Sequence, residues 1–148
     1  MLQITELSPD DRHEWESLWA GYLEFYRHAL SPEMTQLTFE RLLDPNVRMW
    51  GAIARTEAGV AVGIVHWLSH ASTWSAADYV YLEDLFVAPT ARGGGVGRAL
   101  IDHVTGWARE RELPKVYWQT AADNATARRL YDQLASSEFV VYETDTSA

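Results

Sequence analysis

The sequence predicts an α/β fold with a mixed, rather than purely parallel, central sheet. A short strand and two helices precede three consecutive β-rich runs, an order typical of antiparallel strands. From Gly95 onward, helices and strands alternate instead, as they do around parallel strands. The chain has 148 residues, of which 47% are hydrophobic. This is enough for one compact core, so we expect a single domain over residues 1–148.

The first elements are a strand and two capped helices. Residues 2–6 alternate apolar and polar side chains, as a strand does. Residues 8–11, Ser-Pro-Asp-Asp, supply a helix N-cap, a proline for the first turn and acids for the positive end of the helix dipole. Ser31-Pro32 repeats this cap. The second helix is expected to end near Asp44-Pro45, because the residue before a proline disfavours helix.

The first helix has one wide aromatic face. Its large apolar side chains recur at spacings of three and four, at Trp15, Leu18, Trp19, Tyr22, Leu23 and Tyr26. Packing against the core explains most of such a face. Aromatic side chains also line substrate pockets, so Tyr22 and Tyr26, near Phe25 at the end of this helix, are candidate substrate-contacting residues.

The middle of the chain is β-rich. Residues 47–56 and 60–69 are expected to form a hairpin, and residues 79–87 a third strand. Between them, the small side chains of residues 71–78 predict a loop.

The last part of the chain alternates helix and strand. The apolar period changes to 3.6 after Gly95, and Pro114 ends that helix. Residues 116–120 are the next predicted strand. Asp123-Asn124 caps a final helix, and residues 139–142 supply a closing strand.

Composition and missing motifs exclude several functions. Without cysteine there is no thiolate metal site and no cysteine nucleophile. The net charge of −9 argues against a nucleic-acid partner. Neither a serine hydrolase elbow nor a zinc-protease helix motif is present. His66 and His70 would stand ~13 Å apart on one strand face, too far to share a metal, so we expect no metal.

The chain is expected to stay in the cytoplasm and away from membranes. No run approaches the ~20 apolar residues of a membrane helix. The N-terminal residues lack the basic start and apolar stretch of a secretory signal.

A glycine-rich turn between the third β-rich run and the next helix is the most informative segment. Four glycines stand within five residues, at Gly93, Gly94, Gly95 and Gly97. Glycine lets backbone N–H groups converge, and a helix N-terminus adds positive charge, so this turn suits a phosphate. No lysine follows as in a Walker loop, and Leu100 stands where a dinucleotide-binding turn needs glycine or alanine. A plain tight turn is the remaining alternative.

The spacing Arg92-x-x-Gly95-x-Gly97 resembles the pyrophosphate-binding signature of the GNAT acetyltransferase superfamily. Two further motifs accompany it: residues 81–87, Tyr-Leu-Glu-Asp-Leu-Phe-Val, and the spacing Asn124-x-x-Ala127-x-x-Leu130-Tyr131. The Leu-Glu-Asp strand is similar to that of spermidine/spermine acetyltransferases, and residues 117–120 and 130–132 resemble a fungal histone/polyamine acetyltransferase subgroup. The family's usual Gly-Phe pair after the last helix is absent, since Glu138 precedes Phe139.

The resemblance implies a fold and a reaction. The fold would be a mostly antiparallel central sheet of about six or seven strands flanked by about four helices. The reaction would move the acetyl group of acetyl-CoA directly to a primary amine of a polyamine, an amino acid or a protein lysine, in a ternary complex. A homodimer is also implied. The implied coenzyme contacts are Leu85, Phe86, Val87, Arg92, Gly93, Gly94, Gly95, Val96, Gly97, Arg98, Asn124 and Ala127.

Three side chains are candidates for the chemistry. An alkylammonium with a pKa near ~10.4 must lose a proton before it attacks, and the resemblance favours Glu83 as the base. Asp84 is its rival and is otherwise a substrate-binding carboxylate, since neighbouring strand residues face opposite ways unless a bulge rotates them. Tyr131 would protonate the departing thiolate. The alternative function is a non-catalytic acyl-CoA sensor that keeps the phosphate site without the proton transfer.

Overall fold

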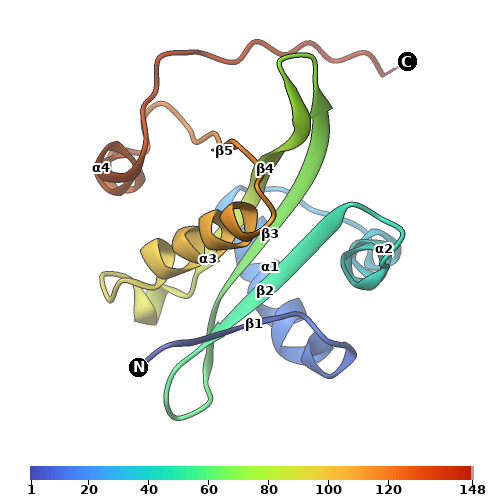
Figure 1. Ribbon diagram of the computed structural model, residues 1–148. Helices are drawn as coiled ribbons and strands as arrows, with labels where there is room; N and C mark the ends of the chain where they lie inside the picture. Colours follow the sequence, from blue (N-terminus) through green and yellow to red (C-terminus); the bar gives the residue numbers. More distant parts are fainter. Residues whose placement is uncertain (148) are drawn as a thin grey trace. The chain divides into compact units, whose positions relative to one another are not determined.

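The computed structural model describes residues 1–147 and divides them into two compact units. The first unit is Met1–Trp118, and the second begins at Gln119. The first unit holds the sheet and helices α1 to α3, and the second holds helix α4 (Figure 1). The prediction that the whole chain is one domain stays a prediction.

The sheet of the first unit is mixed and mostly antiparallel, as predicted. Its order is β1-β2-β3-β4-β5, with antiparallel neighbours up to β4 and with β5 parallel to β4. The described residues form five strands, fewer than the six or seven expected: β1 Gln3–Glu6, β2 Met49–Arg55, β3 Ala61–Ser72, β4 Ser75–Val87 and β5 Val116–Tyr117. They also form four α-helices, as predicted: α1 Arg12–Phe25, α2 Pro32–Leu43, α3 Val96–Glu110 and α4 Ala125–Leu134.

The predicted caps explain where the helices begin. A 3-10 turn at Pro9–Asp11 precedes α1, and the Ser8 N–H donates to the Asp11 carboxylate at 2.8 Å. In α2, the Ser31 hydroxyl accepts the N–H of Met34. These bonds satisfy N–H groups that a helix start leaves without a partner.

Apolar layers cover both faces of the sheet. On one face, Ile64 of β3 packs with the aromatic side of α1 and with α2 in a cluster of buried side chains: Trp15, Leu18, Trp19, Phe39, Leu42, Ile53, Ile64 and Phe86. On the other face, Gly63 of β3 lies against Val96 and Leu100 of α3. Since neighbouring strand residues point to opposite faces, α1 and α2 cover one face of the sheet and α3 covers the other.

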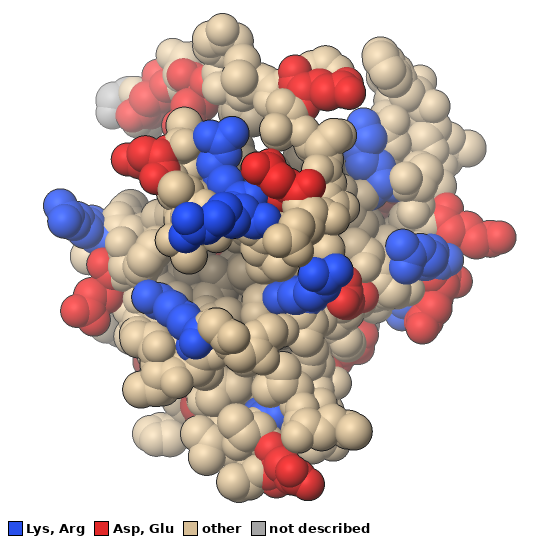
Figure 2. All heavy atoms as spheres, turned by 90° about the vertical axis from the view of Figure 1, so that its left-hand side faces the viewer, with Lys and Arg blue, Asp and Glu red and all other residues tan. Residues whose placement is uncertain are grey.

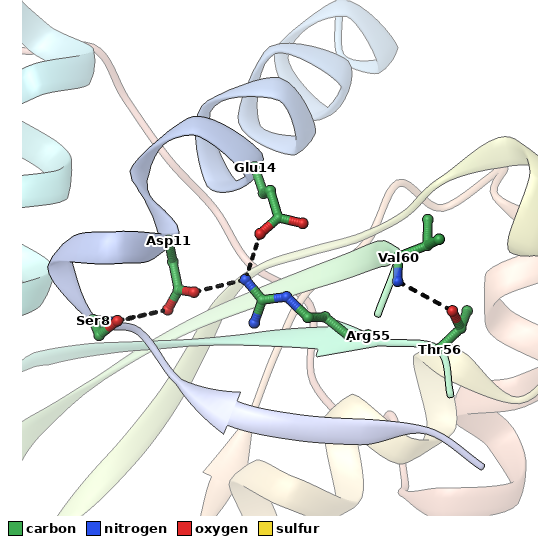
Figure 3. A network of polar contacts seen from close by, with 6 residues as sticks. All are labelled: Ser8, Asp11, Glu14, Arg55, Thr56 and Val60. Atoms are coloured by element: carbon green, nitrogen blue, oxygen red, sulfur yellow. Dashed lines mark hydrogen bonds and ion pairs between the residues drawn. The ribbon is translucent and has the colours of Figure 1, made fainter. Parts of the chain in front are cut away.

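An ion-pair network ties the start of α1 to the end of β2 (Figure 3). The Arg55 guanidinium contacts the Asp11 carboxylate at 2.6 Å and the Glu14 carboxylate at 2.7 Å. Burial acts to raise the pKa of Asp11, but the bonds from Ser8 and Arg55 outweigh it, so the net pKa is lowered. Beside this network, the Thr56 hydroxyl accepts the Val60 N–H and helps to close the β2–β3 turn.

Arg55→Met is expected to lower the free energy of unfolding by about 1–3 kcal/mol, because it leaves the mostly buried Asp11 carboxylate without its cation. Arg48→Met is the matched control. Arg48 also pairs with an aspartate, Asp78, but 64% of its side chain is exposed, so we expect a loss below about 1 kcal/mol. Urea unfolding of both variants measures the difference.

The sign of the pH dependence gives a second check on this network. A lowered pKa means that ionised Asp11 stabilises the fold above the usual carboxyl pKa, and that this contribution is lost as the pH falls through the lowered value. The deficit of Arg55→Met should therefore shrink in acid. Equal losses for the two arginine variants, or a deficit that does not depend on pH, would contradict the assignment.

The structure corrects three predictions about strands. The predicted loop at residues 71–78 is mostly strand, because β3 and β4 continue until Ser72 pairs with Ser75. A weak intrinsic preference for strand is overridden when a neighbouring strand supplies hydrogen-bond partners. The strand predicted at residues 116–120 is only Val116–Tyr117. Residues 139–142 form no strand; their side chains are exposed, and an apolar run without a ladder partner gains little from extended structure.

Among the helices of residues 1–147, none combines the length and the apolar content that crossing a bilayer demands.

Candidate active site

A β-bulge in β4 sets the position of the two candidate carboxylates. Asp84 pairs with His66 of β3, whereas Leu82 pairs with the next β3 residue, Trp67. Glu83 is therefore an extra residue without an opposite number, and the alternation of β4 changes phase at this point. The bulge that the prediction treated as the exception is present.

Asp84 lies on the face that α1 covers. Its carboxylate is 2.9 Å from Nδ1 of His66, and Nε2 of His66 is 2.9 Å from the Trp15 indole nitrogen of α1. Only 16% of the Asp84 side chain and 4% of the His66 side chain are exposed. The position of this carboxylate is thus fixed from the interior.

The end of α1 brings two tyrosines to Asp84. The rings of Tyr22 and Tyr26 lie 4.9 Å apart, and Tyr22 also stacks on Trp19 at 5.3 Å. Burial first, and then the negative charge of Asp84, raise the pKa of both phenols, that of Tyr22 strongly. Both stay protonated and can donate hydrogen bonds at neutral pH. The structure therefore groups the predicted substrate-contacting residues Tyr22, Tyr26 and Asp84.

Glu83 stands beside this group with an exposed side chain. The protein around it removes part of its hydration, which raises the pKa of the carboxyl, and the charge of Asp84 raises it further. The positive charge of Arg41, and that of His66 only when its ring is protonated, acts to lower the pKa without cancelling the rise. A carboxylate with a raised pKa that a ligand can reach is better suited to accept a proton than an ordinary surface glutamate.

Beyond the bulge, β4 has an open edge. Its pairing with β5 covers only Val80 and Tyr81. On the β3 side, the Ala88 N–H donates to the Val62 carbonyl at 2.8 Å. Because antiparallel hydrogen bonds alternate, the backbone groups of Leu85 and Val87 point away from β3, toward the open edge. In the described residues no strand pairs with this edge, which can accept an extended ligand.

Arg92 lies at the end of this edge. Its Nε donates to the Val87 carbonyl at 3.2 Å, which agrees with the outward direction of that group. Its guanidinium is 5.5 Å from the ring centre of Phe25 and 5.8 Å from that of Phe86, the remaining strand residue among the predicted coenzyme contacts. Arg92, which is predicted to bind the pyrophosphate, thus contacts both the strand edge and the end of α1.

The glycine turn follows at once and leads into α3. Gly93 and Gly95 have φ near +84° and +83°, values that favour glycine. A Cβ at either position would meet no atom within 4 Å, so the backbone conformation and not crowding explains the glycines. The first helical N–H groups, such as those of Val96 and Gly97, have no acceptor within α3. On the face of the molecule that Figure 2 shows, Lys and Arg side chains stand among Asp and Glu side chains.

In the second unit, Asn124 caps α4 as predicted. Its side-chain oxygen accepts the N–H of Ala127 at 3.3 Å, and its amide nitrogen is 3.4 Å from the Thr120 hydroxyl. Tyr131 lies on α4 and is half-buried. The roles of Asn124, Ala127 and Tyr131 toward coenzyme or substrate stay predictions.

Sequence reasoning missed two residues of the first unit that are linked to Asp84, namely Trp15 and His66. The helical spacing of Trp15 indicates only core packing, and the distance between His66 and His70 argues only against a shared metal. The link of Trp15 and His66 to Asp84 depends on the register of β3 against β4, for which the sequence carries no local signal. Within residues 1–147, no three His, Asp or Glu side chains gather in a way that could hold a metal ion.

Comparison with known proteins points to one family. Residues 15–135 match the model of the acetyltransferase (GNAT) family. The chain is 40% identical over 143 residues to the D-amino-acid N-acetyltransferase HPA3 of Saccharomyces cerevisiae, which covers 96% of this chain and 85% of that relative.

Two solved structures have a similar fold. One is a ribosomal-protein-alanine N-acetyltransferase from Brucella melitensis biovar Abortus 2308, with a TM-score of 0.82 and 25% identity over 98% of this chain and 99% of the other. The other is AAC(6')-Iy in complex with the bisubstrate analogue CoA-S-monomethyl-acetylneamine, with a TM-score of 0.84 and 19% identity over 99% of both chains.

Proposed function

Because this chain belongs to the acetyltransferase (GNAT) family and is an acetyl-CoA-dependent N-acetyltransferase, we propose that it acetylates the primary amine of a small molecule directly, in a ternary complex. The observation that carries the proposal is the β4 bulge, which sets Glu83 and Asp84 beside the open strand edge of Leu85 and Val87. Donor and acceptor sites would then meet at one point of β4.

The residues of the first unit fit the donor. The outward backbone groups of Leu85 and Val87 suit the amides of a pantetheine arm, which would lie along the edge as an added strand does. The N–H groups of the glycine turn and the start of α3 suit its pyrophosphate, with Arg92 or Arg98 adding charge. Acetyl-CoA brings an activated acyl group, and every other requirement of the reaction falls on the protein.

The proposed step is balanced as follows. Glu83 takes a proton from the alkylammonium, whose nitrogen then attacks the thioester carbonyl while the carbon–sulfur bond breaks. The departing thiolate takes a proton from an acid, a role that the sequence motif around Tyr131 predicts for that residue, and the nitrogen gives up a second proton as the amide forms. The ammonium thus loses two protons: one ends on the coenzyme thiol, and the other leaves through Glu83 to solvent.

We propose an amino acid as the first acceptor to test. The relative HPA3 is a D-amino-acid N-acetyltransferase. The carboxylates of Glu83 and Asp84, with two tyrosines beside Asp84, suit a cationic ammonium group. Polyamines and protein lysines present the same group, so the comparison must include them.

The test is thiol release from acetyl-CoA with D- and L-amino acids, spermidine, an aminoglycoside and a lysine peptide. A chromogenic thiol reagent reads the product without background, because the chain contains no cysteine. We expect release with at least one amino acid and none without an amine. If calorimetry shows that acetyl-CoA binds but no amine yields thiol, the proposal fails and the acyl-CoA sensor alternative takes its place.

A further inference from the structure

A buried chain of hydrogen bonds runs from α1 to the candidate site through His66. Trp15 is 0% exposed, and its indole N–H donates to Nε2 of His66 at 2.9 Å. On its other side, the His66 ring nitrogen Nδ1 is 2.9 Å from Oδ2 of Asp84. These hydrogen bonds therefore connect the core of the protein to the partly exposed carboxylate of Asp84.

Trp15 fixes which nitrogen of His66 carries the proton. The indole nitrogen can only donate, so Nε2 of His66 must accept and holds no hydrogen. The ring hydrogen is then on Nδ1, which donates to Asp84. This bond holds one oxygen of Asp84, Oδ2, and leaves the other oxygen, Oδ1, as an acceptor for other donors.

Packing alone does not explain why a side chain with two polar ring nitrogens, His66, stands at this position. The His66 ring lies among aromatic rings, 5.9 Å from Trp15 and 5.3 Å from Trp19. A leucine would fill such a site without a polar atom to desolvate, whereas a buried imidazole must be satisfied on both nitrogens. The hydrogen bonds with Trp15 and Asp84 satisfy both nitrogens, and Asp84 is the partner that reaches the candidate site.

We propose that His66 and Trp15 are positioning residues, which hold Asp84 as the anchor for the ammonium group of the acceptor amine. This inference rests on the proposed acetyltransferase function. It also gives the two carboxylates at the bulge different roles. Asp84, held by the hydrogen bond from His66, orients the amine, and Glu83, which is exposed beside it, takes the proton.

The kinetic test compares three variants with acetyl-CoA and an amine that the unchanged protein accepts. His66→Leu removes the donor, and we expect it to raise the KM for the amine at least tenfold; Asp84→Asn is expected to have the same effect. His66→Asn keeps an N–H near the position of Nδ1 and should stay within about threefold of the unchanged protein. The dissociation constant for acetyl-CoA should not change in any of them.

Two controls separate positioning from loss of stability. Leu42→Ala creates a cavity in the core cluster that also contains Trp15, but it removes no atom of the Trp15–His66–Asp84 hydrogen bonds. It should lower the melting temperature without raising the KM for the amine. The double variant His66→Leu with Asp84→Asn should be no worse than Asp84→Asn alone, because both changes break one bond. Additive effects, or an unchanged KM in His66→Leu, would overturn the proposal.

A spectroscopic arm does not depend on catalysis. Nitrogen-15 correlation spectra of the imidazole side chains should show His66 with its proton on Nδ1, and Trp15→Phe should disturb that pattern. A proton on Nε2 in the unchanged protein would overturn the proposal even if the enzyme is active. An inactive enzyme with the expected His66 pattern would instead point to failure of the proposed function.

Discussion

Glu83→Gln is expected to lower kcat about 100- to 10,000-fold, the range for loss of a general base. Glutamine keeps the size of the side chain but cannot take the proton from the ammonium. The dissociation constant for acetyl-CoA should stay within about twofold, because the bulge side chain lies outside the glycine turn and the outward backbone groups of β4. Steady-state kinetics and calorimetry measure the two quantities.

The pH profile of the unchanged enzyme should carry the same signature. The pKa of Glu83 is raised, mainly by lost hydration and then by Asp84. The base works only when ionised, so kcat/KM should rise with pH through a value above that of an ordinary glutamate. In Glu83→Gln this rising limb should disappear.

Stability provides the control for this variant. A carboxyl whose pKa is raised on folding binds its proton more tightly in the folded state, so its ionisation costs stability as the pH rises through the raised value. Glu83→Gln removes that cost, and its melting temperature at neutral pH should be equal to or above that of the unchanged protein. Glu110→Gln, an exposed acid on α3, should alter neither kcat nor the melting temperature. Near-normal kcat in Glu83→Gln together with a collapse of kcat in Asp84→Asn would assign the base to Asp84.

The second large effect should come from placing a negative charge in the glycine turn. Gly94→Asp is expected to weaken acetyl-CoA binding about 100-fold. A carboxylate ~5 Å from one phosphate charge costs about 3 kcal/mol at an effective dielectric constant of 20. Gly94 is exposed and lacks the positive φ of its neighbours, and a Cβ there would come no nearer than 3.4 Å to another atom, so the fold should tolerate the change.

Two matched variants isolate the charge. Gly94→Ala adds the Cβ alone and should change the dissociation constant less than about threefold. Gly106→Asp adds the same charge within α3, away from the turn, at a position where a Cβ meets nothing within 4 Å, and coenzyme binding should be unaffected. Added salt should narrow the gap between Gly94→Asp and Gly94→Ala, because ions screen the repulsion. If both Gly94 variants bind like the unchanged protein, the phosphates lie elsewhere.

Much of the fold was readable from local signals. The caps at Ser8, Ser31 and Asn124 and the stop before Pro114 act within a few residues of sequence, and all four helices lie where these signals predict. The strand ends were less predictable. Residues 71–78 and 139–142 show why: whether a stretch is a strand depends on a partner, which composition does not specify.

The helices, the mixed sheet and the glycine turn of residues 92–98 could be predicted from the sequence alone. In the turn, the positive φ at Gly93 and Gly95 is a conformation that glycine adopts without strain, so the local sequence is enough to indicate it. Only the tertiary structure decided where the carboxylates of Glu83 and Asp84 lie. The bulge at Glu83 and the bonds that hold Asp84 follow from how β3 and β4 pair and from the packing of α1 on that face. Cross-strand register is set by contacts between residues far apart in the chain, and no single stretch of sequence encodes it.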